Sequence, residues 1–252
     1  MSLNKEIIIS PSRREQIYQF IKKLNIDSIH IKKIKEENSQ NLYLIDEALT
    51  HTSANSLVNH ERLEFLGDAV LRLAATEFIE MNFPSMDVGD RSALRSELVS
   101  DKWLTKVGRS LAIDKVLLVG NKASGDKSAI ETLQAESTEA LIGAMYECLQ
   151  NLEAIHQWLK PYWEEESASV LSNPYKNNSK SALQEWSQKR GLKLPEYHLE
   201  ELNKKHGNSK RFFCKVHIDG KAIGEGWGGS RKEAEKEAAK MAIASLEAIK
   251  TN

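Results

Sequence analysis

The 252-residue sequence predicts two domains of different class: an all-α domain over residues 13–160 and an α+β domain, of order α-β-β-β-α, over residues 178–248. Apolar residues recur at helical spacing in the first part, whereas alternating, strand-like segments occur only in the second. Charge divides in the same way, because residues 178–252 hold 15 Lys and Arg against 10 Asp and Glu, while the remainder has a net charge of −6. Residues 164–177, rich in Glu, Ser and Asn, are expected to form the linker.

The helices of the first domain are expected from their apolar periodicity. Residues 12–24 place Ile17, Phe20, Ile21 and Leu24 at helical spacing. The rest of this part consists of long apolar-periodic segments separated by short breaks, NFPSMDVGD and VGNKASGDKSA. Neither break is followed by an alternating strand, so we expect helices throughout.

The second domain changes pattern after the linker. The segment KSALQEWSQKRG predicts a helix that ends at Gly191. Two strands are expected in EYHLEELNKK and RFFCKVHIDG, and a third strand or a turn in KAIGEGWGG. The last segment, SRKEAEKEAAKMAIASLEAIK, predicts an alanine-rich helix capped by Ser230.

Composition narrows the setting in which the protein works. No apolar run approaches the roughly 18–20 residues that a membrane span needs, and the first residues lack the apolar core of a signal peptide. Cys148 and Cys214 lie far apart without the spacing of a zinc site or a disulfide framework. We therefore expect a cytoplasmic protein with no membrane contact and two buried thiols.

Three carboxylates lie in the otherwise apolar segment HERLEFLGDAVLRLA. On a helical wheel, Glu61, Glu64 and Asp68 fall within about 60° of one another. Phe65 and Leu71 flank them, so the wheel predicts a narrow acidic slot between apolar walls. The simpler alternative is a set of local ion pairs with nearby arginines, since one arginine follows Asp68 by four residues.

A second apolar helix carries acids as well. In LQAESTEALIGAMYECL, Glu136 and Glu139 lie about one turn apart, and Gly143 follows one turn later on the same face. The missing side chain lets another helix or a ligand approach closely, and simple helix–helix packing explains this glycine equally well. Two acidic stripes brought face to face make an oxygen-rich pocket suited to Mg²⁺ or Mn²⁺. Metal ions there can activate water and stabilise a leaving phosphate oxygen.

These residues also resemble a known family. ERLEFLGDAVL is similar to the signature stretch of ribonuclease III, an endonuclease of double-stranded RNA, with further matches in ALTHTS, LRSELVSDKWL and ESTEALIGAMY. The C-terminal module resembles the double-stranded-RNA-binding domain of that family. The resemblance covers the chain from about residue 13 and implies the bacterial single-chain form, a homodimer through its nuclease domain. It also implies 5′-phosphate products with short 3′ overhangs, from ribosomal RNA precursors and other structured transcripts.

The resemblance assigns roles to the acidic residues. It implies catalytic roles for Asp68, Glu139 and Glu61, the last nearer to the RNA. The implied metal ligands are Glu64, Glu136, Glu139 and Asp68, with Mg²⁺ as cofactor and Mn²⁺ as a substitute.

Three positions depart from the family pattern. Glu136 stands where aspartate is usual, Val88 where glutamate is common, and Thr52 where a basic residue is frequent. The longer Glu136 side chain should be tolerated less well by Mg²⁺, which demands near-ideal octahedral geometry, than by Mn²⁺. Glu136 and Val88 are also the best support for a rival function, a double-stranded-RNA-binding regulator with impaired catalysis.

The C-terminal module offers basic groups to RNA phosphates. Double-stranded RNA is recognised through 2′-hydroxyls and phosphates over about 16 base pairs. In GGSRKEAEKEAAK, a helix N-terminus that favours anions carries Arg231, Lys232 and Lys236. The alternative is a solvated helix face on which Glu233, Glu235 and Glu237 pair with these cations.

Two further RNA contacts are implied by the resemblance. Gln184 and Glu185 match positions that contact a minor groove, and the loop NKKHGNSKR is expected to reach the next groove. In that loop either His206 or Asn208 fills the contact position, and the sequence leaves the choice open.

Overall fold

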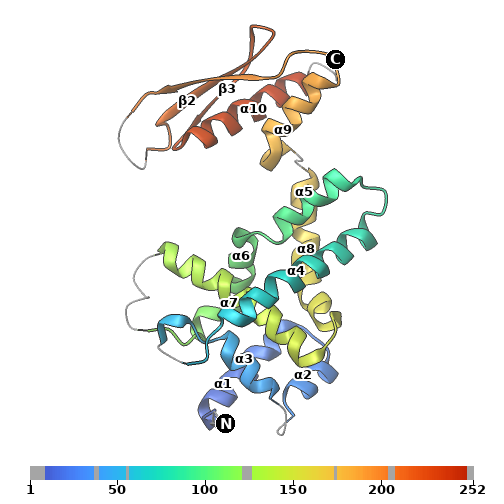
Figure 1. The fold of residues 1–252 in the computed structure, drawn as a ribbon, viewed down its shortest axis with the longest axis vertical. Coiled ribbons are helices and arrows are strands. Elements are labelled where there is room, and N and C mark those ends of the chain that lie inside the picture. Colours follow the sequence, from blue (N-terminus) through green and yellow to red (C-terminus); the bar gives the residue numbers. More distant parts are fainter. Residues whose placement is uncertain are drawn as a thin grey trace, which may run out of the picture. The chain divides into compact units, whose positions relative to one another are not determined.

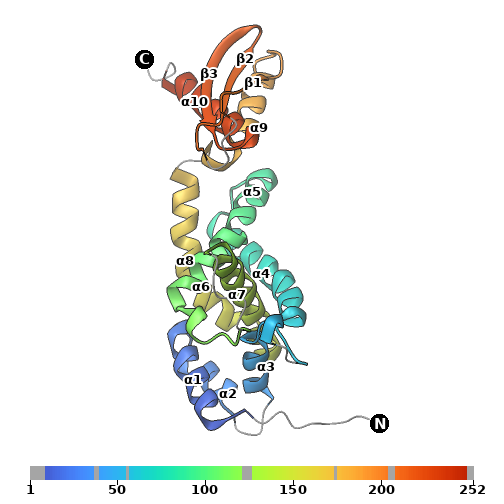
Figure 2. The ribbon, with the colours of Figure 1, turned by 90° about the vertical axis from the view of Figure 1, so that its left-hand side faces the viewer.

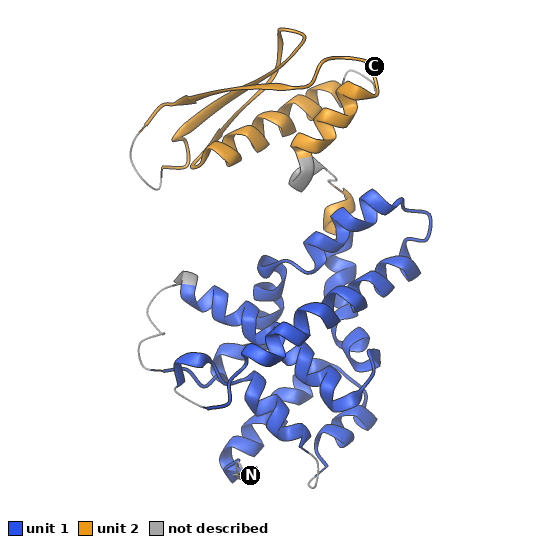
Figure 3. Ribbon diagram, in the orientation of Figure 1, with its two compact units in different colours: residues 1–167 blue, residues 168–252 orange. Residues whose placement is uncertain are grey.

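The computed structural model describes residues 9–36, 40–54, 57–120, 127–172, 175–203 and 208–248. The chain forms two compact units, Met1–Ser167 and Ala168–Asn252 (Figure 3). The first unit is helical and the second combines helices with a sheet, which confirms the predicted fold class (Figure 1). No helix in the described part of the chain is long and apolar enough to cross a membrane.

Eight α-helices, counted over the described residues, begin within the first unit. They are α1 (Pro11–Ile21), α2 (Ser28–Ile34), α3 (Asn41–Ala48), α4 (Glu61–Asn82), α5 (Val88–Leu98), α6 (Asp101–Leu111), α7 (Lys127–Leu149) and α8 (Glu153–Ser172). Within the break NFPSMDVGD, Asp87 caps α5. Its side chain accepts a hydrogen bond from the backbone N–H of Asp90. Apart from a single β-bridge between Thr50 and Leu118, the described residues of this unit contain no strand pairing.

Helices α4 and α7 pack with their backbones in near contact at the centre of this unit (Figures 1 and 2). A Cβ atom added to Gly67 would lie 1.9 Å from the carbonyl oxygen of Glu139. One added to Gly143 would lie 2.1 Å from the carbonyl oxygen of Leu63. Both glycines are therefore needed for the close approach, and the expectation that Gly143 admits a neighbouring helix is confirmed.

The segment expected to form a linker is largely helical. Helix α8 continues to Ser172 and buries Trp163 and Ser167 along its length, and α9 (Tyr175–Gln188) begins three residues after α8 ends. Residues 164–172 contain mainly Glu, Ala, Ser and Leu, and helix formation by such residues is only mildly unfavourable at worst. The chain divides into its two units after Ser167, within the expected linker, and this part of the segment is helical up to Ser172.

The second unit packs two helices on a three-stranded antiparallel sheet (Figure 1). Its strands are β1 (Glu196–Glu201), β2 (Phe212–Ile218) and β3 (Lys221–Gly228), in the order β1-β2-β3, followed by α10 (Arg231–Ala248). The segment KAIGEGWGG is therefore a strand. Ser230 accepts a hydrogen bond from the backbone N–H of Glu233 at 3.2 Å, which confirms the predicted cap of the last helix.

Small residues allow α10 to lie close on β3. A Cβ atom on Gly226 would lie 2.3 Å from the backbone nitrogen of Ala238, and one on Gly224 would lie 2.5 Å from the Ala238 carbonyl oxygen. In the GEGWG segment of β3, every second residue faces α10, and these residues are the glycines. The alanines of α10 recur every four residues and so lie on the face of the helix that contacts them. The small residues of the GEGWG segment and of the alanine-rich helix together allow this close packing.

Candidate active site

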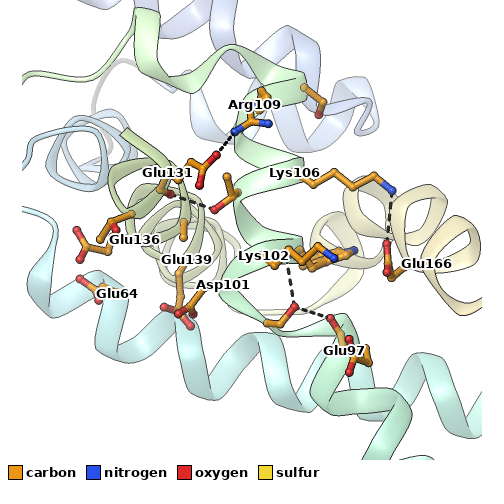
Figure 4. Close-up of a pocket in the computed structure, with 16 residues that line it drawn as sticks. Glu64, Glu97, Asp101, Lys102, Lys106, Arg109, Glu131, Glu136, Glu139 and Glu166 are labelled. Carbon is orange, nitrogen blue, oxygen red and sulfur yellow. Dashed lines mark hydrogen bonds and ion pairs between the residues drawn. The ribbon is translucent and has the colours of Figure 1, made fainter. Parts of the chain in front are cut away.

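Four acids from three helices lie together in one pocket of about 890 Å³ in the first unit. Glu64 comes from α4, Glu136 and Glu139 from α7, and Asp101 from the start of α6. Figure 4 shows these four side chains gathered on one side of the pocket. The close α4–α7 contact at Gly67 explains this meeting, because it holds the Glu139 backbone against α4 one turn from Glu64.

Burial and mutual repulsion change the acidity of two of these carboxyls. Burial, followed by the charges of Asp68, Glu64 and Asp101, raises the pKa of Glu139 to about 7. Burial and then the charge of Glu136 raise the pKa of Glu64 above its ordinary value. Among the described residues, no Lys or Arg forms an ion pair with Glu64, Glu136 or Glu139. These three carboxylates therefore lie together without a Lys or Arg ion-pair partner among the described residues, although the charge of Arg72 offsets part of the rise at Glu139.

Asp68 differs from its neighbours because it has a cation. The Nε atom of Arg72 lies 2.8 and 3.0 Å from the two Asp68 carboxylate oxygens. The alternative of a local ion pair is therefore correct for Asp68. It is wrong for Arg62, which binds Glu47 and Glu147 away from the cluster.

The predicted apolar walls are only partly present. Leu71 is buried beside the acids, but Phe65 is 86% exposed and forms no wall. The wheel places Phe65 correctly next to the acidic stripe, but no described element of this chain covers that side of α4. Glu61 is also exposed, at the first residue of the helix, and its charge affects the pKa values of Glu64 and His51.

Three side chains that the sequence did not predict, those of His51, His60 and Asp101, also lie at the cluster. His51 and His60 stack with ring centroids 5.1 Å apart, and each has its Nε2 within 4 Å of the Glu136 carboxylate. His51, His60 and Glu136 are the described residues that bring three ligand atoms within 4.8 Å of one another. His51 lies in the quoted ALTHTS and Asp101 in LRSELVSDKWL, so both family matches contained the signal.

The pocket is also lined by basic side chains of α6. Lys102, Lys106 and Arg109 line it, as Figure 4 shows. Lys106 is paired with Glu165 at 2.8 Å and Arg109 with Glu131 at 3.0 Å. Glu97, Glu131 and Glu166 line the pocket as well, so Lys102 is the one of these three cations that forms no ion pair within the described residues. A cation beside the acidic cluster can help to receive a phosphodiester.

The donor set of the acidic side suits a divalent cation. Glu64, Asp68, Glu136 and Glu139 offer the carboxylate oxygens that Mg²⁺ and Mn²⁺ prefer. The raised pKa values of Glu64 and Glu139 mean that their ionised forms are destabilised in the protein alone. A bound cation would relieve that repulsion, so these residues fit such an ion.

The expected RNA-binding residues of the second unit lie on its surface. Gln184 and Glu185 are exposed on α9, and Arg231 and Lys232 are exposed at the start of α10, with Lys236 partly exposed. Among the described residues, none of these three cations forms an ion pair. The alternative, in which the neighbouring glutamates pair with them, is wrong: Glu235 binds Lys180 and Glu237 binds Lys240.

The N-terminus of α10 is already partly capped by an acid. Glu233 Oε2 accepts hydrogen bonds from the backbone N–H groups of Gly229 at 2.8 Å and Ser230 at 3.3 Å. Together with the Ser230 cap, this is a capping box. The expectation of an open anion site at these N–H groups is therefore corrected, and any phosphate contact here depends mainly on the basic side chains.

The remaining expected positions are placed differently. His206 lies outside the described residues. Asn208 accepts a hydrogen bond from the backbone N–H of Lys210 at 2.9 Å, so its side chain stabilises a turn. Val88 is 78% exposed at the start of α5, and Thr52 begins the 3-10 turn Thr52–Ala54.

Comparisons with known proteins agree with this division. Residues 41–158 match a family model described as "Ribonuclease-III-like", and residues 179–246 match the "Double-stranded RNA binding motif". The chain is 56% identical to a protein named Ribonuclease 3 from Prochlorococcus marinus, covering 95% of this chain and 96% of the relative. It is 38% identical to Ribonuclease 3 2 of a Nostoc species, with coverage of 95% and 96%. With Ribonuclease 3 of Gloeobacter violaceus it shares 35% identity over 96% of both chains.

Proposed function

Because the chain belongs to the ribonuclease III family, we propose that the acidic cluster of α4 and α7 is the site at which it cleaves its substrate. The chain is a double-stranded-RNA endoribonuclease with a nuclease domain and an RNA-binding domain. The observation that carries the assignment is the set of uncompensated carboxylates, in which Glu139 has its pKa raised to about 7. Strongly perturbed acids in a pocket are typical of catalytic sites.

Enzymes of this family depend on a divalent metal, and we assign Mg²⁺, with Mn²⁺ as a substitute, to this pocket. Glu64, Glu136, Glu139 and Asp68 would hold it. When bound, such a cation supplies a water of lowered pKa and neutralises charge that develops on the phosphate. The support is that Glu64, Glu136 and Glu139 have no Lys or Arg partner among the described residues, so a bound cation would balance their charge.

The protein's own groups have separate tasks in this proposal. Glu139 and Asp68 orient the attacking water, since they are adjacent acids of which one is half-buried and the other is held by Arg72. Glu61, exposed at the start of α4, lies on the side from which RNA approaches. Lys102 of the pocket wall contributes positive charge toward the phosphate backbone. The products are 5′-phosphate ends with short 3′ overhangs.

The second unit binds the duplex in this proposal. Arg231, Lys232 and Lys236 contact phosphates, and Gln184 and Glu185 reach a minor groove from the surface of α9. Asn208 or His206 supplies the contact from the loop between the first two strands. The support is that the basic side chains are available, since they form no ion pair within the described residues.

We infer that the enzyme is a homodimer through its nuclease domain. Phe65 is exposed on α4 although it is a large apolar residue beside the active-site acids, and Leu73, two turns along, is also exposed. A second copy of the chain could cover these two side chains of α4, and symmetric dimers are the commonest homo-oligomers. Sedimentation of the wild type beside Phe65→Asp tests this, because the variant should sediment as a monomer.

The substrates that fit this activity are ribosomal RNA precursors and structured messenger RNAs, processed in the cytoplasm. Buried free thiols at Cys148 and Cys214 are compatible with a reducing compartment. Mapping the 5′ ends of cellular RNAs with and without the enzyme would identify the sites that it cuts.

Incubation with labelled duplex RNA in Mg²⁺ or Mn²⁺, beside a Glu139→Ala control, tests the function itself. We expect wild type to cut both strands and the variant to bind without cutting. Binding without cutting by the wild type in both metals would instead support the rival function of an RNA-binding regulator, for which the exposed Val88 is the structural argument.

A further inference from the structure

The ring of His60 is buried against two carboxylates. Its side chain is 2% exposed, and its Nε2 atom lies 3.3 Å from Glu64 Oε2 and 3.7 Å from Glu136 Oε2. Glu64 and Glu136 are about one-third exposed and line the pocket. The imidazole thus enters the acidic cluster from the α4 end, where the preceding loop meets the helix.

A backbone carbonyl determines which nitrogen of His60 carries the proton. The Nδ1 atom lies 3.2 Å from the carbonyl oxygen of Thr50, which can only accept a hydrogen bond. The same oxygen accepts the backbone N–H of His60 at 2.9 Å, so both the backbone and the Nδ1 edge of the ring are held by Thr50. In the neutral ring, Nε2 therefore presents a lone pair to two carboxylates. This arrangement is repulsive unless a proton on Nε2 or a metal cation lies between the ring and the carboxylates.

His51 has the opposite arrangement. Its Nδ1 accepts the backbone N–H of Ser53 at 3.1 Å, so the neutral ring carries its proton on Nε2, which points toward Glu136 at 3.9 Å. His51 is therefore placed to position the Glu136 carboxylate rather than to bind a metal.

We propose that His60 Nε2 is a direct ligand of the divalent cation held by Glu64 and Glu136, so that this chain has a mixed nitrogen–oxygen metal site. The proposal rests on the assignment of the carboxylate cluster as the metal site. A histidine that donates Nδ1–H to a backbone carbonyl and directs Nε2 at the metal is the usual arrangement of a metal-bound imidazole. Adjacent ligands of a cation at about 2.1 Å lie about 3 Å apart, which is close to the 3.3 and 3.7 Å separations here.

An imidazole ligand changes which metal is preferred. Mg²⁺ takes oxygen ligands almost exclusively, whereas Mn²⁺ and later divalent ions of the first row accept imidazole increasingly well. The longer Glu136 side chain contributes to this arrangement, because its carboxylate reaches the two histidines. Mn²⁺ is therefore the ion that this set of ligands favours over Mg²⁺.

Pulsed EPR of Mn²⁺ bound to the full-length protein tests the proposal without measuring activity. We expect a nitrogen hyperfine coupling from directly bound imidazole, which changes when the protein is made with ¹⁵N-labelled histidine. His60→Asn should abolish the coupling and lower Mn²⁺ affinity on the order of ten- to a hundredfold, with a smaller effect on Mg²⁺. Asparagine keeps an N–H that can bind the Thr50 carbonyl, so the start of α4 is preserved.

Two matched controls complete the experiment. His51→Asn should retain the coupling, and so should His156→Asn, whose ring binds the single carboxylate of Glu77 at 2.8 Å away from the cluster. Mn²⁺ bound to wild type without nitrogen coupling, or a coupling that persists in His60→Asn, would overturn the proposal while leaving the carboxylate metal site intact. Failure of the wild type to bind Mn²⁺ at all would reject both. If His60→Asn does not fold, the labelled wild type and His51→Asn together still decide.

Discussion

Among the described residues, three acidic side chains in the cluster of α4 and α7 lack a Lys or Arg partner, whereas three on the surface of the second unit have one. In the cluster, Glu64, Glu136 and Glu139 lie together without an ion pair to Lys or Arg among the described residues. In the second unit, Glu201, Glu235 and Glu237 each have a cation partner, and Glu233 caps a helix. Among the described residues, the first unit thus gathers acids without a paired cation, whereas the second unit leaves cations without a paired acid.

The largest effect should follow from removing a carboxylate of the cluster. Glu64→Gln keeps the shape of the side chain but removes a charge, so we expect cleavage of duplex RNA to fall on the order of 10²- to 10³-fold, with duplex binding retained. Glu77→Gln on the same helix is the control, since Glu77 pairs with His156 outside the pocket. Equal cleavage by Glu64→Gln and wild type would show that the negative charge of Glu64 is not needed for cleavage.

The matching change in the second unit is the removal of its unpaired cations. Arg231→Ala with Lys232→Ala should weaken duplex binding and reduce its dependence on salt, by about 1 in the logarithmic slope for each phosphate that the protein no longer binds. Binding at several salt concentrations measures this slope. Lys240→Ala, on the same helix but paired with Glu237, should leave the slope unchanged. An unchanged slope in the double variant would contradict a phosphate-binding role.

A smaller change is expected from shortening one acid of the cluster. Glu136→Asp moves the carboxylate away from His51 and His60, which both lie within 4 Å of it. Cleavage supported by Mg²⁺ should then improve relative to cleavage supported by Mn²⁺ by a few fold. Parallel assays of both proteins over a range of each metal measure the ratio, and identical metal profiles would refute the expectation.

The smallest effect concerns the stability of the metal-free protein. The folded state binds a proton at Glu139 more tightly than the unfolded chain, because the pKa is raised from 4.5 to about 7. The associated stability is present below the lower value and is lost as pH rises through the higher one. Between about pH 5 and about pH 8, Tm should therefore fall less in Glu139→Gln than in wild type. Calorimetry in the presence of a chelator measures Tm at each pH. If Tm falls equally in the wild type and in Glu139→Gln, the raised pKa is contradicted.

Much of the contrast between the two units could be predicted from sequence. Helical periodicity placed Glu64 and Asp68 on one face of α4, and Gly143 indicated that another helix could approach closely. The charge asymmetry indicated a basic C-terminal module. These features depend on local spacing and composition, which a sequence displays directly.

Other parts required tertiary structure. A helical wheel describes one helix and not what covers it, so Phe65 was expected to be a wall but is exposed. His60 reaches the cluster because the carbonyl of Thr50, ten residues earlier, orients its ring, and Asp101 arrives from another helix. Residues 164–172, within the expected linker, are helical, and composition alone did not show this because charged helix surfaces and linkers have similar compositions.

Measurement of the pKa of Glu139 by NMR, with and without a saturating divalent cation, tests whether the acidic cluster is a metal site. We expect a carboxyl that titrates with a pKa of about 7 in the metal-free protein and at a distinctly lower pH with Mg²⁺ bound. A Glu139 that titrates near its ordinary pKa of 4.5, or that does not respond to Mg²⁺, would contradict it.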